Sequence, residues 1–267
     1  MRLDDVKAFV FDVDGTLVHR AGDEVHVQPG AAEVLAKIRR SGRRLAIFTN
    51  GSHAPPAWFA QGLRDAGLDI AHDELLTPLR SVRVYLRMRR ADGPVLAFAT
   101  GPVREFLSEQ GMSLAGAEGP VDAVFVAHTD TVDFELLERA ARAVMGGAML
   151  LTASFAPAYA GANGPILSRG AMTAAAIAKA AGRRPVVVGK PSRAALRTIE
   201  EQLQTPASEI AVIGDDLAMD VRLGRMGGAR TVLVASGITG QVEHERIPPP
   251  HRPHAVVGGV AELLDLL

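Results

Sequence analysis

The sequence contains no cysteine among its 267 residues, and this absence removes several kinds of chemistry. A disulfide framework, a thiolate nucleophile and a cysteine zinc site are all excluded. Neither sign of charge dominates, because 29 basic residues stand against 30 acidic ones and the formal net charge is −1. We therefore expect no surface of the kind that binds nucleic acid or anionic membranes.

Long apolar runs are also missing, since none approaches the roughly 20 residues that a membrane-spanning helix needs. The first residues show no signal-peptide pattern, so we expect a cytoplasmic protein with no membrane partner. What is present is typical of a globular chain, with 48% hydrophobic and 22% charged residues. The length allows a large core and two domains.

Apolar strand-like runs alternate with helical patterns along the chain, which favours an α/β protein with parallel sheets. A second α/β pattern interrupts the first, as an insertion at an exposed loop would. We predict one domain from residues 1–77 and 183–267, and an inserted domain from residues 78–182. Strands of the first domain are expected at 8–11, 45–48, 186–188, 209–213 and 231–235, and strands of the insert at 95–99, 123–127 and 149–152.

The most informative motif is Asp12-Val13-Asp14-Gly15-Thr16, directly after the buried strand expected at 8–11. Ligands of open α/β sheets bind at the carboxyl ends of the strands. Two carboxylates at this point indicate a nucleophile beside a general acid/base, or a metal site. Asp and Gly are also common in turns, so this motif alone fits a simple turn as well. The segment 17–27 that follows has the pattern of a small hairpin.

Three more polar motifs follow strands expected in the same domain. They are Thr49-Asn50-Gly51, Lys190, and the acidic residues Asp215, Asp216 and Asp220. Taken singly, they also fit a turn, a solvated helix start and a helix N-cap. Parallel strands would bring all four motifs to one edge of a sheet. Independent turns and caps do not explain four such motifs in this order.

The acidic residues of these motifs need a counter-charge. Two carboxylates about 4 Å apart repel by roughly 4 kcal/mol at an effective dielectric constant near 20. Lys190 supplies one positive charge, which is not enough, so a divalent cation is expected. An all-oxygen donor set favours Mg²⁺ over zinc, and Mg²⁺ commonly binds a substrate phosphate as well. Thr49, the following backbone amides and Lys190 suit that phosphate.

In this order the motifs resemble the haloacid dehalogenase-like hydrolase superfamily, whose members are mostly Mg²⁺-dependent phosphatases. The segments Phe-Thr-Asn-Gly-Ser (48–52), Val-Gly-Lys-Pro-Ser (188–192) and Gly-Asp-Asp (214–216), with the insert between them, resemble its nitrophenylphosphatase-like branch. The resemblance implies an α/β fold in which a Rossmann-like parallel-sheet core domain carries an inserted α/β cap domain of the C2 type. It also implies hydrolysis of a phosphomonoester.

The resemblance implies a role for each motif. Asp12 would attack phosphorus and form an aspartyl-phosphate, and Asp14 would act as the general acid and then as the general base. Lys190 would neutralise charge, while Thr49 and the amides of Asn50 and Gly51 would hold the phosphoryl oxygens. Mg²⁺ would be held by Asp12, the Asp14 carbonyl and Asp215, with its waters held by Asp220 and Asp216.

The substrate implied is a small phosphorylated metabolite such as a nucleotide, a sugar phosphate or phosphoglycolate. Contacts that distinguish substrates are expected from the cap, at His128, Asp130, Ser154 and Phe155. The branch often has Thr-Asn-Pro-Asp where this chain has Thr152-Ala153-Ser154-Phe155, so no particular substrate carries over. A homodimer through the cap is a further expectation.

Two alternatives belong to other functional classes. A haloacid dehalogenase also uses an aspartate nucleophile, but it needs neither Asp14 as an acid/base nor a metal site built on Asp215 and Asp220. A non-catalytic member that binds a phosphorylated ligand would typically lack one carboxylate, and none is missing here.

Overall fold

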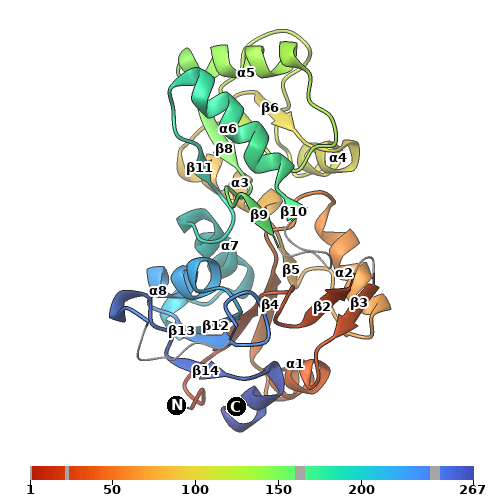
Figure 1. The fold of residues 1–267 in the computed structure, drawn as a ribbon, viewed down its shortest axis with the longest axis vertical. Helices are drawn as coiled ribbons and strands as arrows, with labels where there is room; N and C mark the ends of the chain where they lie inside the picture. Colours follow the sequence, from red (N-terminus) through yellow and green to blue (C-terminus); the bar gives the residue numbers. More distant parts are fainter. Residues whose placement is uncertain (1, 22–23, 160–165, 241–246) are drawn as a thin grey trace.

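The computed structural model of the protein describes residues 2–21, 24–159, 166–240 and 247–267. Two α/β units are stacked along the long axis, and both chain termini lie at the end of the lower unit (Figure 1). We call the unit built on the six-stranded sheet the core and the unit built on the four-stranded sheet the cap.

The core sheet has the strand order β14-β13-β12-β1-β4-β5, and every neighbouring pair is parallel. The central strand β1 (Ala8–Phe11) is fully buried, as an apolar run in a parallel sheet should be. The other strands are β4 (Arg44–Phe48), β5 (Leu75–Leu76), β12 (Ile210–Gly214), β13 (Arg230–Val234) and β14 (Ala255–Val257).

Helices cover both faces of the core sheet because alternate strand residues point to opposite sides. Phe9 and Phe11 of β1 pack with α1 (Ala31–Arg40) and α2 (Pro56–Asp65). Val10 lies on the other face with α7 (Arg193–Leu203) and α8 (Arg222–Gly227). Short helical segments complete the core at η1 (Ala207–Glu209), η2 (Leu217–Val221), η4 (Pro249–His251) and η5 (Val260–Asp265).

The expected hairpin after the first motif is confirmed. Strands β2 (Val18–Ala21) and β3 (Glu24–Val27) pair in antiparallel fashion, and residues 22–23 between them lie outside the described part of the chain.

The cap sheet has the order β11-β8-β7-β6 and is also parallel throughout. One face packs against α3 (Pro78–Met88) and α4 (Gly101–Glu109), and the other against α5 (Phe134–Met145) and α6 (Arg169–Ala181). The strands are β6 (Val95–Phe98), β7 (Ala123–Val126), β8 (Met149–Thr152) and β11 (Val186–Val187), with a small hairpin of β9 (Ala158–Tyr159) and β10 (Ile166–Leu167). The predicted fold class, α/β with two parallel-sheet units, is confirmed.

One strand assignment is wrong. The run 186–188 was expected in the core sheet, but Val186 and Val187 pair with Leu151 and Thr152 of the cap sheet. An apolar run specifies a buried strand but not the sheet that it joins, because that choice depends on contacts distant in sequence. The edge strand of the core sheet beside β4 is the two-residue β5. The division of the chain at residues 77/78 and 182/183 stays a prediction.

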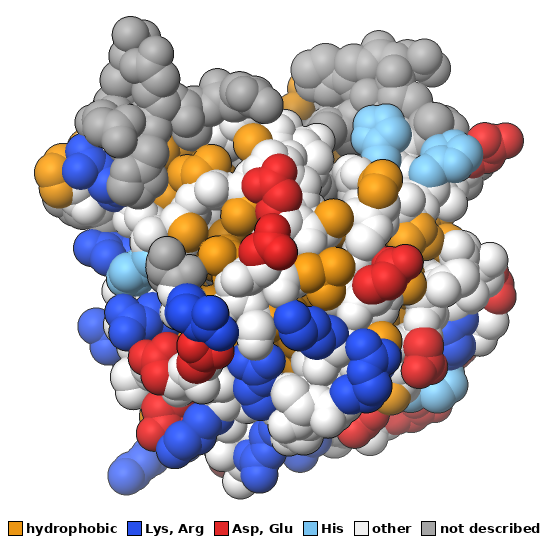
Figure 2. Space-filling model, turned by 90° about the horizontal axis from the view of Figure 1, so that it is seen from below, with side chains coloured by type: hydrophobic (Ala, Val, Ile, Leu, Met, Phe, Trp, Pro, Cys, Tyr) orange, Lys and Arg blue, Asp and Glu red, His pale blue; other side chains and the backbone are white. Residues whose placement is uncertain are grey.

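The surface opposite the cap mixes charges of both signs. Lys and Arg side chains lie among Asp and Glu side chains on this face rather than forming a patch of one sign (Figure 2). Among the helices of the described residues, none combines the length and apolar composition that a bilayer crossing requires. The expected absence of nucleic-acid and membrane partners stays a prediction.

Candidate active site

The predicted carboxylates meet at the carboxyl edge of the core sheet. Asp12 follows β1 and Asp215 follows the adjacent strand β12, while Asp220 lies on η2. Each of the three offers an oxygen, and these oxygens all lie within 4.8 Å of one another. Asp215 and Asp220 are buried, so the group is a cluster of nearly dry carboxylates rather than a solvated acidic surface.

Lys190 reaches this cluster from the loop after β11. Its Nζ atom donates to Asp12 Oδ1 at 2.5 Å and to Asp220 Oδ1 at 2.7 Å, and only 3% of the residue is exposed. Burial alone would lower the pKa of Lys190, but the two carboxylates outweigh that effect and raise it. Lys190 is therefore a fixed positive charge across the neutral pH range.

Asn50 holds the backbone of Lys190 against the core. Its side-chain Nδ2 donates to Lys190 O at 2.9 Å, and Lys190 N donates to Asn50 Oδ1 at 2.7 Å. Gly189 makes this approach possible, since a Cβ there would lie 2.5 Å from Asn50 Oδ1 and 2.3 Å from Ala153 O. The Asn50 side chain thus positions Lys190, a role that the sequence did not predict.

The acidic cluster is short of positive charge. Burial, followed by repulsion from Asp12, raises the pKa of Asp215 to about 7. Burial likewise raises the pKa of Asp220 to about 8, because Lys190 only partly offsets it. Three carboxylates facing one ammonium group are a donor set that fits a hard divalent cation. The protein therefore has an acidic group able to hold a metal ion.

Asp215 is also held by the loop after β13. Ile238 N donates to Asp215 Oδ2 at 2.6 Å, and a Cβ at Gly237 would lie 1.9 Å from the same oxygen. Only glycine allows that loop to lie so close to the carboxylate. The sequence signal for this contact was a glycine shortly after an apolar strand, which is too common to identify a site.

Asp216 lies beside the cluster but outside the group of three. Its Oδ1 accepts from Ala218 N at 2.7 Å and from Met219 N at 3.2 Å, so it caps the segment η2. These two hydrogen bonds to the start of η2 explain the position of the Asp216 side chain. Its place in a metal shell stays a prediction.

Asp14 also lies outside the group of three and pairs with an arginine of the hairpin. Arg20 Nε donates to Asp14 Oδ1 at 2.5 Å. About half of the Asp14 side chain is exposed; its partial burial raises its pKa, and Arg20 partly opposes that increase. The sequence did not predict the contact between Arg20 and Asp14. The contact depends on the β2–β3 hairpin, which turns Arg20 back toward the motif that precedes it.

The loop after β4 carries Thr49 and Gly51. Thr49 is buried, and its Oγ1 accepts from Gly51 N at 3.0 Å, so this amide has an internal partner. A Cβ at Gly51 would lie 2.6 Å from the Phe59 ring, which explains glycine at this position. Phosphate binding by Thr49, Asn50 and Gly51 stays a prediction.

Of the four cap residues, His128 contacts this core loop, whereas Asp130 contacts His128 and Arg169 within the cap. His128 N donates to Ser52 Oγ at 3.1 Å, and the rings of His128 and His53 are 6.0 Å apart. Asp130 Oδ1 lies 2.9 Å from Arg169 Nη1 and 3.3 Å from His128 Nε2. Burial, followed by repulsion from His128, lowers the pKa of His53.

The other two cap residues follow β8. Ser154 comes directly after Ala153, whose carbonyl accepts from Gly189 N at 3.1 Å beside Lys190. Ser154 Oγ accepts a hydrogen bond from Ala156 N, and Phe155 is 42% exposed. Substrate contacts by these four cap residues stay predictions.

The chain matches the family described as haloacid dehalogenase-like hydrolase over residues 9–113 and a HAD-hydrolase-like family over residues 187–263. It is 30% identical over 258 residues to the ribonucleotide monophosphatase NagD of Escherichia coli (strain K12), covering 97% of this chain and 98% of that protein. The chain belongs to the haloacid dehalogenase-like hydrolases.

Two further similarities agree with this family. Dihydroxyacetone phosphatase of Corynebacterium glutamicum (strain R) is 27% identical over 97% of this chain and 90% of that protein. The structure of the p-nitrophenyl phosphatase from Archaeoglobus fulgidus superimposes with a TM-score of 0.85 at 26% identity, covering 98% of this chain and all of that one (100%). These proteins are named phosphatases, so the predicted branch and the predicted phosphomonoester hydrolase are confirmed, and the dehalogenase alternative is not favoured.

Replacing Asn50 tests the positioning of Lys190. Asn50→Ala removes both side-chain contacts to the Lys190 backbone but keeps the residue 50 amide. We expect kcat to fall by roughly 10- to 100-fold, since displacing a reacting group by about 1 Å has effects of this size. Steady-state kinetics with an aryl phosphate measures the change, and an unaltered kcat would show that Lys190 is held by other contacts.

The raised pKa values of Asp215 and Asp220 predict the effect of pH on the metal-free protein. Both lie above the unfolded carboxyl value of about 3.9, so between pH 6 and 8 the folded state binds more protons than the unfolded state. Stability should therefore fall as pH rises through this range. Mg²⁺ should raise Tm more at pH 8 than at pH 6, because metal ligands must be deprotonated.

Thermal denaturation in EDTA and in Mg²⁺ at the two pH values measures this effect. Asp220→Asn is the control variant, since an amide at this position does not titrate. It should weaken the pH dependence, whereas an equal Mg²⁺ effect at both pH values in the wild type would contradict the prediction.

Proposed function

We propose that the protein is a Mg²⁺-dependent phosphatase that hydrolyses a small phosphorylated metabolite through an aspartyl-phosphate at Asp12. The observation that carries this proposal is the position of the Asp12 carboxylate, which is 2.5 Å from the Lys190 ammonium and part of the acidic group able to hold a metal. A carboxylate between two sources of positive charge is suited to attack an anionic phosphoryl group.

In the first step an Asp12 oxygen attacks phosphorus, and the bond from phosphorus to the ester oxygen breaks. Protonated Asp14 donates its proton to that leaving oxygen, which departs as an alcohol. Lys190 holds positive charge beside the Asp12 carboxylate, so the two anions can approach each other. Thr49 and the amides of Asn50 and Gly51 would bind the remaining phosphoryl oxygens.

In the second step Asp14, now ionised, takes a proton from water as the water attacks phosphorus. The bond from phosphorus to Asp12 breaks, inorganic phosphate leaves, and both carboxyl groups return to their starting forms. Arg20 donates to Asp14 Oδ1 and therefore favours the ionised form that this step requires.

Mg²⁺ would be held by Asp12, the Asp14 carbonyl and Asp215, with Asp220 and Asp216 holding its waters. When bound, it would offset charge on the phosphoryl oxygens. The excess of carboxylates over Lys190 in the buried cluster supports this part of the proposal.

The cap would meet the organic part of the substrate at His128, which contacts the core loop at Ser52, and at Asp130, which lies beside His128. Three relatives are named ribonucleotide monophosphatase, dihydroxyacetone phosphatase and acid sugar phosphatase. Their names support a small phosphomonoester as the substrate but do not favour one of these compounds. A cytoplasmic location and a homodimer through the cap remain predictions.

Asp12→Asn tests the proposed nucleophile. The variant should fold normally but release less than a few per cent of the wild-type phosphate, because an amide does not attack phosphorus. Phosphate release from an aryl phosphate and from a panel of phosphorylated metabolites measures this, with EDTA and with added Mg²⁺. Asp4→Asn, a surface change, serves as the control, and full wild-type activity in excess EDTA would contradict the metal requirement.

Asp14→Asn tests the proposed acid/base. With ordinary alkyl phosphates the rate should fall by ~10²–10⁴, the usual contribution of such a group. The loss should be smaller when the leaving group departs without a proton, as p-nitrophenolate does. Comparing kcat for the two ester types in the two proteins measures this, and equal losses would argue against the role.

A further inference from the structure

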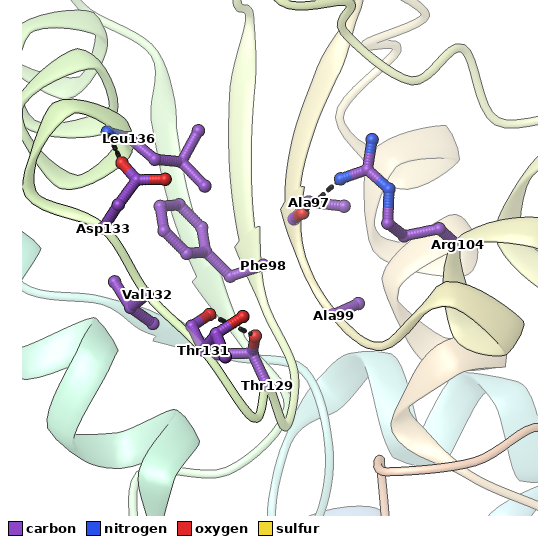
Figure 3. Close-up of a pocket in the computed structure, with 9 residues that line it drawn as sticks. All are labelled: Ala97, Phe98, Ala99, Arg104, Thr129, Thr131, Val132, Asp133 and Leu136. Atoms are coloured by element: carbon purple, nitrogen blue, oxygen red, sulfur yellow. Dashed lines mark hydrogen bonds between the residues drawn. The ribbon is translucent and has the colours of Figure 1, made fainter.

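We propose that the cap contains a second ligand site, a cavity that binds a small zwitterion through Arg104 and Asp133. The cavity has a volume of about 320 Å³ and lies among the end of β6, helix α4, the loop after β7 and the start of α5 (Figure 3). None of its lining residues belongs to the four motifs of the candidate active site.

The topology of the cap sheet explains why a cavity forms there. After β6 the chain enters α4, which packs on the sheet face of Ala97 and Phe125, whereas after β7 it enters α5 on the face of Phe98 and Val126. Adjacent strands thus send their connections to opposite faces. In open α/β sheets such a switch point opens a crevice outside the carboxyl ends of the strands, where ligands bind.

Two opposite charges line this crevice. Arg104 forms no ion pair with any described residue, and its Nη1 donates to Ala97 O at 2.7 Å. Asp133 stands across the end of β6 from it (Figure 3) and caps α5 through Oδ1, which accepts from Leu136 N at 2.6 Å. A guanidinium with unused donors favours a carboxylate, and a carboxylate with a free oxygen favours an ammonium group.

The rest of the lining is apolar or fixed. Phe98 is 2% exposed and Leu136 is half-buried, while Val132 is 37% exposed at the rim. The Thr129 hydroxyl donates to Thr131 O at 2.8 Å, which braces the loop on that side. The volume lies at the small end of the range for ligand pockets, about 300–1,000 Å³. A small α-amino acid with an aliphatic side chain fits these features.

L-valine is the probe for this site, and two analogues each lack one of its charges: 3-methylbutanoate and 2-methylpropan-1-amine. Titrations of the full chain followed by amide NMR should show saturable shifts for L-valine at residues 129–136. Both analogues should bind at least about threefold more weakly, in line with the loss of one exposed ion pair. This readout needs no catalysis, so it stands or fails separately from the proposed function.

Two variants remove one charge each. Arg104→Gln deletes the cation, and Asp133→Ser deletes the anion while keeping a residue that caps α5 well. Each should weaken L-valine binding about threefold or more, by the same argument. Arg89→Gln, a change at an exposed arginine of the cap outside the cavity, should leave binding unaltered.

Three results would overturn the proposal. The first is the absence of saturable shifts at L-valine concentrations up to about 20 mM, which would mean a binding free energy weaker than about 2.3 kcal/mol. The second is binding of either analogue as tight as that of L-valine, which would remove one of the two charge contacts. The third is a set of shifts centred on Asp12 and Lys190 instead of on residues 129–136.

Discussion

The ammonium group of Lys190 lies between Asp12 and Asp220, and the arrangement of the candidate site depends on this contact. Without it, three carboxylates at the edge of the core sheet would face one another with no positive charge, in surroundings too dry to screen them. With it, the cluster keeps a deficit of positive charge that a metal ion is suited to fill. The Lys190 ammonium thus stabilises the buried carboxylates but does not neutralise all three of them.

Small residues make these close contacts possible. A Cβ at Gly214 would lie 2.2 Å from Asp220 Cγ, and one at Gly15 would lie 2.3 Å from Asp215 Oδ2. Gly237 likewise lets the loop after β13 lie against Asp215, and Gly189 lets the segment before Lys190 lie against Asn50 and Ala153. The positions of the charges therefore depend on close backbone contacts, and a methyl group at Gly15, Gly214 or Gly237 would collide with Asp215 or Asp220.

Local patterns in the sequence predicted much of this protein. The buried runs, the hairpin and the positions of Asp12, Thr49 and Asp215 directly after strands were correct, because strand ends and turn residues are encoded within a few neighbours. The assignment of residues 186–188 to the core sheet was wrong, and the contacts of Arg20, Ile238 and the Asn50 side chain were missed. Each of these depends on which distant segments lie side by side, and a single sequence does not show that.

The strand that precedes Lys190 belongs to the cap, whereas Asn50, which holds the Lys190 backbone, belongs to the core. Between Val187 and Lys190 only two residues separate these attachments, and one of them is Gly189. A tilt of the cap relative to the core must be absorbed in this short segment and around Thr77, where the chain enters α3. Lys190 is thus attached to both units, so any change in the position of the cap would also act on the charge at the core edge.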